Sequence, residues 1–139
     1  MTARSYSALI LILDCDLGFM MWLGQVFAEL GYQTIPALTC RQALVLVRRF
    51  DLPVATLVLN WELRGARRLV KILAAENPGL QIITIRDSAA RRNGQQQAAP
   101  NCMWIVSSLE RPAPGESISC GEWAVRVRKA LAPPAGAPN

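Results

Sequence analysis

Short unbroken apolar runs alternate with segments of helical periodicity along most of this chain. The run at 8–13 is continuous, has the length of a strand and ends at Asp14, which is the pattern of a strand buried on both faces. Further segments of strand length, two of them directly preceded by Gly, predict four more strands: 32–37, 55–59, 80–85 and 103–106.

The segments between these runs carry apolar residues three or four positions apart, which predicts helices. Thr39 is expected to cap the second helix, and Gly31 to end the first. The stretch 88–100 shows almost no apolar periodicity, so we expect there only a short or frayed helix with a mobile loop. The clearer predicted helices are 19–30, 40–49, 64–75 and 116–131.

Alternating strands and helices predict an α/β fold, a doubly wound five-stranded parallel sheet flanked by about five helices. We expect one domain at 1–131 and a disordered Pro/Ala-rich tail at 132–139. Right-handed crossovers bring the carboxyl ends of the strands to one edge, where such folds build their sites. Asp14, Asn60 and Arg86 all follow predicted strands and should meet at that edge.

The composition limits the kinds of partner and site that we expect. The 139 residues are 52% apolar and 18% charged, with 15 Lys and Arg against 10 Asp and Glu. The net charge of +5 favours acidic partners or nucleic acid, although such a charge also keeps a protein in solution. There is no His, and the four Cys are scattered, so we expect no metal site, no cofactor and no enzyme. No apolar run is long enough to span a membrane, and we expect a cytoplasmic protein.

Four motifs occur in a fixed order along the chain. They are Leu13-Asp14-Cys15-Asp16, the stretch 57–65 with Asn60 after an apolar run and Gly65 five positions later, Leu109-Glu110-Arg111-Pro112, and Glu116-Ser117-Ile118. Their spacing from about 8 to 130 resembles the receiver domain of bacterial response regulators. This resemblance implies the flavodoxin-like strand order 2-1-3-4-5 and a role in two-component signalling or a phosphorelay.

The resemblance also implies a degenerate site. The aspartate that accepts the phosphoryl group corresponds to Asn60, and an amide is not a carboxylate nucleophile. The acid pair that holds a divalent metal corresponds to Asp14 and Cys15, with Asp16 one residue later. The phosphoryl-contacting hydroxyl residue corresponds to Arg86, and the invariant lysine to Arg111 or, in another register, to Ser107.

A pseudo-receiver of this kind loses two of the three carboxylates that magnesium needs. We expect Arg86 to reach across the pocket to Asp14 or Glu62 and to fill it with a permanent ion pair. The alternative is that Arg86 is an ordinary solvated residue at the end of a strand.

Several residues are candidates for contacting a partner. Met20 and Met21 make the first helix apolar on more than one face, unless Met20 covers a neighbouring helix. Trp104 or Ser108, depending on register, corresponds to a switch aromatic of the family, and Trp123 is either core or dimer contact. A basic stripe with helical spacing is either a docking surface or a solvated face: Arg64, Arg67, Arg68 and Lys71.

The sequence therefore predicts a phosphorylation-independent atypical receiver domain that acts as a protein-interaction module. The expected partner is a histidine kinase, a phosphotransfer protein or an effector, and a homodimer could form through the last strand and helix. Two alternatives are a residual phosphate- or ligand-binding receiver and a basic nucleic-acid-associated module. We do not expect nucleic acid as the main partner, because aromatic residues are few between the basic ones.

Overall fold

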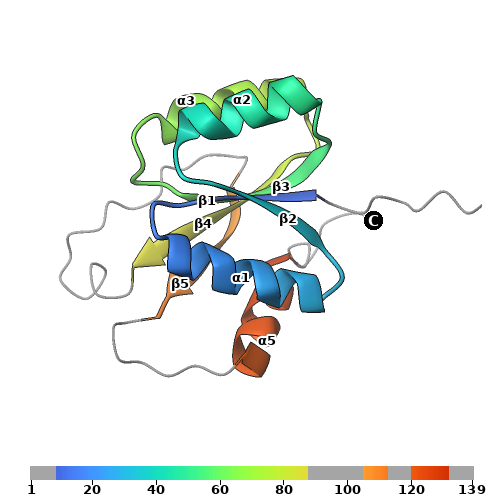
Figure 1. Ribbon diagram of the computed structural model, residues 1–139, viewed down its shortest axis with the longest axis vertical. Coiled ribbons are helices and arrows are strands. Elements are labelled where there is room, and N and C mark those ends of the chain that lie inside the picture. The colour runs from blue at the N-terminus through green and yellow to red at the C-terminus, as the bar shows by residue number, and fades with distance from the viewer. Residues whose placement is uncertain (1–8, 88–104, 113–119, 132–139) are drawn as a thin grey trace, which may run out of the picture.

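The computed structural model describes residues 9–87, 105–112 and 120–131, and the account that follows concerns these residues. Five parallel strands form one sheet in the order β2-β1-β3-β4-β5, which is the predicted order (Figure 1). The strands are β1 (Leu9–Leu13), β2 (Gln33–Ala37), β3 (Val54–Asn60), β4 (Gln81–Asp87) and β5 (Ile105–Arg111).

Helices cover both faces of this sheet. In Figure 1, α2 (Cys40–Phe50) and α3 (Ala66–Glu76) lie above the sheet, whereas α1 (Leu17–Glu29) and α5 (Cys120–Leu131) lie below it. Alternate residues of β1 divide between the two cores. Leu11 and Leu13 pack with the α2 and α3 side, and Ile10 and Ile12 pack with the α1 and α5 side. This double burial explains why β1 is an unbroken apolar run.

Local capping agrees with the sequence. The Thr39 side chain accepts a hydrogen bond from the backbone N–H of Gln42 and begins α2, as predicted. Gly31 follows the end of α1 with φ of +92°, a left-handed conformation that glycine adopts without strain. Asp16 caps α1 and accepts from the N–H of Phe19 at 3.0 Å. This cap starts α1 two residues before the predicted Phe19.

Three strands are longer at their carboxyl ends than the apolar runs predicted, and β3 is longer by Asn60 alone. β4 continues through Arg86 to Asp87, and β5 extends to Arg111 rather than ending at Val106. The two polar ends pair with each other, Arg86 with Glu110 and Asp87 with Arg111. Apolar runs mark only the buried part of a strand, so they miss a polar end that still pairs through its backbone.

Other predicted boundaries shift by a few residues or fall outside the described part. α3 begins at Ala66, because Gly65 turns there with φ of +84° and Arg64 lies in the preceding turn. Four helices lie within the described residues, against about five predicted. The segment 88–100, the tail 132–139, Trp104 and the start of the last predicted helix at 116–119 are outside the described residues.

Candidate functional site

Three polar side chains meet at the carboxyl edge of the sheet, where the fold was expected to build its site. Asp14 follows β1, Asn60 ends β3 and Arg111 ends β5. β1 and β3 are neighbours, whereas β5 is two strands beyond β3. The long arginine side chain therefore spans this distance to reach Asp14.

Asp14 is the centre of the site. It is fully buried, and each carboxylate oxygen is bound within the described structure. Oδ1 accepts the backbone N–H of Cys15 at 2.7 Å and the Nδ2 of Asn60 at 3.1 Å. Oδ2 accepts Nη2 of Arg111 at 2.6 Å. A buried carboxylate with this set of donors is compensated both in charge and in hydrogen bonds.

Arg111 binds two carboxylates at once. While Nη2 contacts Asp14, Nη1 lies 3.2 Å from Oδ2 of Asp16. Asp16 uses its other oxygen to cap α1, so the guanidinium also holds the first turn of that helix. The planar fork of arginine suits two acceptors, whereas an ammonium would be a single point of charge. Arg111 thereby ties the end of β5 to the start of α1.

Asn60, at the end of β3, completes the network. Its amide nitrogen donates to Asp14, and its oxygen accepts the backbone N–H of Glu62 at 3.0 Å. An aspartate at this position could accept from Glu62 but, when ionised, could not donate to Asp14. The amide therefore suits a neighbouring carboxylate that a second acid would repel.

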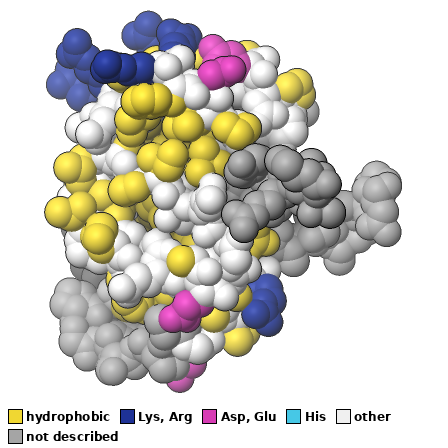
Figure 2. All heavy atoms as spheres, turned by 45° about the vertical axis from the view of Figure 1, so that its right-hand side comes forward, with side chains coloured by type: hydrophobic (Ala, Val, Ile, Leu, Met, Phe, Trp, Pro, Cys, Tyr) yellow, Lys and Arg dark blue, Asp and Glu magenta, His cyan; other side chains and the backbone are white. Residues whose placement is uncertain are grey.

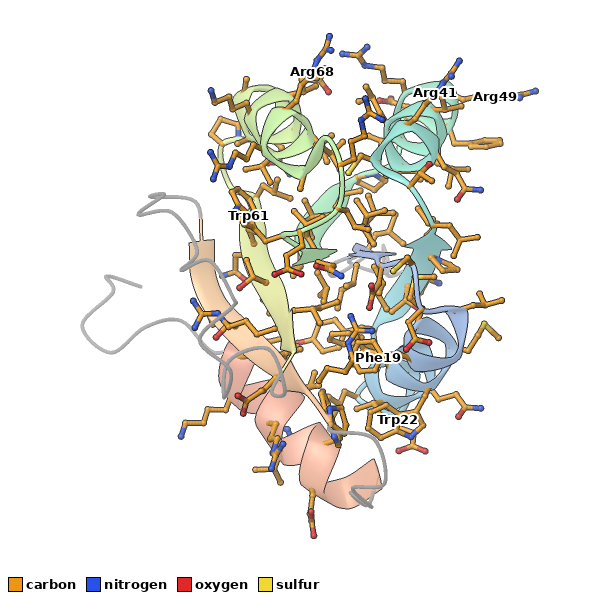
Figure 3. All side chains as sticks on the ribbon, turned by 90° about the vertical axis from the view of Figure 1, so that its left-hand side faces the viewer. Phe19, Trp22, Arg41, Arg49, Trp61 and Arg68 are labelled. Carbon is orange, nitrogen blue, oxygen red and sulfur yellow. The ribbon has the colours of Figure 1, made fainter. Side chains whose placement is uncertain are left out.

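An aromatic cluster packs against the other side of Arg111. The guanidinium carbon of Arg111 lies 4.9 Å from the ring centroid of Phe19, which is a cation–π distance. Phe19 packs edge-on against Trp123 at 5.9 Å, and Trp22 packs edge-on against Trp123 at 4.9 Å. Figure 3 shows Phe19 and Trp22 on α1, one turn apart. This contact could not be inferred from the sequence, because Phe19 fits the apolar period of α1 like any core residue.

The predicted ion pair of Arg86 is wrong. Asp14 pairs with Arg111 instead, and the described residues show no ion pair between Arg86 and either Asp14 or Glu62. Arg86 is half-buried near the end of β4, while Glu62 and Cys15 are exposed. Ser107, the alternative to Arg111 in the receiver resemblance, donates its hydroxyl to the carbonyl of Ala130 in α5 at 2.8 Å.

The fold family implies a divalent metal, and the donors here do not fit one. Magnesium needs several free oxygen ligands in near-octahedral geometry. One carboxylate oxygen of Asp14 and one of Asp16 already bind the guanidinium of Arg111, and Asn60 turns its nitrogen towards Asp14. No group of three Asp, Glu, His or Cys able to hold a metal occurs in the described part of the chain. The arrangement is a closed electrostatic network.

The candidate partner residues separate into buried and exposed ones. Met20 and Trp123 are buried in the core between the sheet, α1 and α5, at 1% and 0% exposure, so both are core residues. Met21 is exposed at 61%. Arg64, Arg67, Arg68 and Lys71 are all exposed on or next to α3. Trp104 lies outside the described residues, and Ser108, three residues before Arg111, is exposed on β5.

The chain has the fold of response regulator receiver domains. The signal receiver domain of an HD domain-containing protein from Pseudomonas fluorescens Pf-5 aligns with a TM-score of 0.65 and 20% identity, over 94% of this chain and 91% of that one. A response regulator receiver domain protein from Clostridium thermocellum aligns with a TM-score of 0.62 and 10% identity, over 89% and 94%.

NtrX from Brucella abortus also aligns, with a TM-score of 0.65 and 16% identity over 89% of this chain, which spans 26% of NtrX. At these identities the similarity establishes the fold and not the activity. The sequence matches no protein-family model and no curated protein. Among the described residues, no helix is both long and apolar enough to cross a membrane.

Proposed function

We propose that this chain is a receiver-fold domain that works without phosphorylation, by binding a protein partner in a two-component-type signalling pathway. The observation that supports this most directly is the contact of Arg111 with both Asp14 and Asp16. In the receiver family a divalent metal neutralises the acid pair, whereas in this chain the guanidinium of Arg111 neutralises Asp14 and Asp16. The domain then has one state at this site, whatever the phosphorylation level of the pathway.

The chemistry of the site supports the same proposal. Phosphoryl transfer needs a positioned nucleophile and neutralisation of charge on the transferring group. Asn60 is no nucleophile, and Asp14 is buried with all the contacts described above. Asp16 is more exposed, but it caps α1 and binds Arg111. Each carboxylate is thus engaged in holding the fold together, so the domain acts by binding rather than by catalysis.

The partner in this proposal is a histidine kinase, a phosphotransfer protein or an effector. A receiver fold whose site is fixed can still present its surface helices to such a protein. Because the network joins the end of β5 to the start of α1, it fixes an edge strand of the sheet relative to a helix that covers one face of the sheet.

The test is exposure of the full chain to a small-molecule phosphodonor with magnesium, followed by intact mass measurement. We expect no phosphoryl adduct on the native chain. The same treatment of an authentic receiver domain is the positive control. An acid-stable or hydroxylamine-sensitive adduct mapped to Asp14 or Asp16 would overturn the proposal and favour a residual phosphate acceptor.

A further inference from the structure

The outer surface of the α2 and α3 layer differs in charge from the α1 side of the molecule. Residues 40–76 contain seven Arg and Lys and three Asp and Glu, whereas α1 and α5 together contain three Arg and Lys and two Glu. Figure 2 shows Lys and Arg side chains gathered at the upper end of the molecule, where α2 and α3 lie in Figure 1. Figure 3 shows Arg41, Arg49 and Arg68 pointing away from the sheet.

Most of these cations have no acidic partner within the described structure. The ion pair found there joins Arg48 to Glu76 across the two helices at 3.3 Å, and both side chains are about half exposed. Arg67 lies over the ring of Trp61 and Arg49 over that of Phe50, at 6.0 and 5.8 Å. An excess of unpaired arginine on one face produces a positive potential that attracts acidic partners.

The same surface exposes apolar side chains among the arginines. Val45 is 51% exposed and lies four residues from both Arg41 and Arg49, so the three share one side of α2. Phe50 is 61% exposed at the end of the helix, beside Arg49. Arginine and aromatic residues are enriched in the buried centres of protein interfaces.

We propose that the outer face of α2 and α3 is the docking surface for an acidic protein segment that also carries apolar side chains. This inference rests on the proposed function and names the face and the chemistry of the partner. We call this surface, defined by Arg41, Val45, Arg49, Phe50 and Arg68, the basic face. An acidic segment would pair with the arginines and cover Val45 and Phe50.

The apolar residues decide between this partner and other polyanions. A nucleic-acid backbone would contact the arginines but would gain little from covering Val45, since affinity there comes from phosphate neutralisation. An anionic bilayer would require a broad apolar face, and the basic face offers two large exposed apolar side chains. Only a protein segment uses both the charges and the apolar side chains.

The experiment measures fluorescence anisotropy of a labelled synthetic helix that bears Glu residues beside a Leu stripe, titrated with the full chain. A matched helix with Ser in place of Leu is the second probe. We expect saturable binding of the Leu helix and binding about tenfold weaker for the Ser helix, which corresponds to about 1.4 kcal/mol. No binding of the Leu helix, or equal binding of both helices, would overturn the proposal.

Two variants locate the surface. Arg41→Glu with Arg49→Glu should weaken binding of the Leu helix by tenfold or more, and Val45→Ser should weaken it about threefold. The matched control, Arg128→Glu with Lys129→Glu on α5, removes the same charge from exposed positions elsewhere and should change binding less than twofold. Equal losses in the α2 and α5 pairs would overturn the proposal by showing a non-specific charge effect.

Two further probes address the other polyanions. Duplex DNA or vesicles of anionic lipid that bind more tightly than the Leu helix at the same ionic strength would overturn the proposal in favour of that class. These outcomes are independent of the phosphodonor experiment. A phosphoryl adduct there refutes the locked site, whereas failure of the Leu helix to bind refutes only the basic face.

Discussion

Nη2 of Arg111 lies 2.6 Å from Oδ2 of Asp14, so the contact joins two residues that are 97 positions apart in the sequence, at the ends of β5 and β1. The carboxylate is fully buried, and the arginine side chain is 19% exposed. A pair in this setting is screened little by water, and its two charges depend on each other. The proposal that the site has a single state follows from this ion pair.

Replacement of Arg111 by Met should destabilise the protein strongly. The change keeps much of the side-chain volume but leaves the buried charge of Asp14 without its cation. Removal of one partner from a buried pair costs about 3–5 kcal/mol, and the partial exposure of Arg111 places the expected loss near 3. Urea denaturation followed by circular dichroism measures it.

The control for this variant is Arg48→Met. Arg48 pairs with Glu76 at 3.3 Å, but the two side chains are 57% and 50% exposed. An exposed pair contributes about 0–1 kcal/mol, so this variant should lose no more than that. Similar losses in the two variants would contradict the view that the Arg111 contact is the stabilising one.

Asn60→Asp should make stability depend on pH. The new carboxyl group would lie beside the buried Asp14 and would lose the donor that now contacts it at 3.1 Å. Two ionised carboxylates at this contact would repel each other, so the variant should be less stable where both are ionised than at acidic pH. The free energy of unfolding should therefore fall as the pH rises from about 4 to 7.

The matched variant for this prediction is Asn60→Ala, which removes the same donor without adding a charge. It should cost about 1–3 kcal/mol with little extra dependence on pH over that range. Thermal unfolding at several pH values distinguishes the two. If the two variants show parallel pH profiles, repulsion between the carboxyl groups is not the cause.

Trp123→Ala should destabilise the fold and disturb the site together. Trp123 is fully buried and packs against both Phe19 and Trp22, so its loss leaves a large cavity costing about 3–5 kcal/mol. Val125→Ala on the same helix is the control, because Val125 is 65% exposed and should change stability by less than about 0.5 kcal/mol. Near-ultraviolet circular dichroism should weaken only in the tryptophan variant.

The two cysteines described in full should differ in reactivity. Burial raises the pKa of the Cys40 thiol by desolvating its thiolate, while Cys15 is exposed. Iodoacetamide at mildly alkaline pH should label Cys15 in the folded protein and Cys40 only after unfolding, as peptide mass mapping would show. Because the folded pKa of Cys40 is raised, its contribution to stability is lost as pH rises above the ordinary thiol value. Rapid labelling of Cys40 in the native state would contradict its burial.

The fold was predictable from the sequence to a large extent, because strands buried on both faces appear as continuous apolar runs. The run 8–13 and the capping residue Thr39 both predicted their elements correctly. The end of β5 was missed because the apolar run stops at Val106 and most of the residues beyond it are polar, although Glu110 and Arg111 still pair in register with β4. Apolar periodicity does not mark polar residues, even where they lie next to the buried Leu109 and are themselves partly buried.

The site was predicted in part. Asp14 and Asn60 follow apolar runs, so their meeting at the strand edge could be inferred and is confirmed. The cation was assigned to Arg86 rather than Arg111, since Arg86 directly follows an apolar run. Choosing between two arginines requires the reach and direction of each side chain, and sequence spacing does not contain that information. The contact of Arg111 with Phe19 was hidden for the same reason.

The central claim, that Arg111 permanently occupies the acid site, is tested most directly by amide and guanidinium NMR spectra of the full chain, recorded with magnesium and then beryllofluoride added. The account predicts unchanged shifts at Asp14, Asn60 and Arg111, and a slowly exchanging Arg111 guanidinium signal under every condition. Magnesium- or beryllofluoride-dependent shifts centred on these three residues would show a site that still opens and binds, and would contradict it.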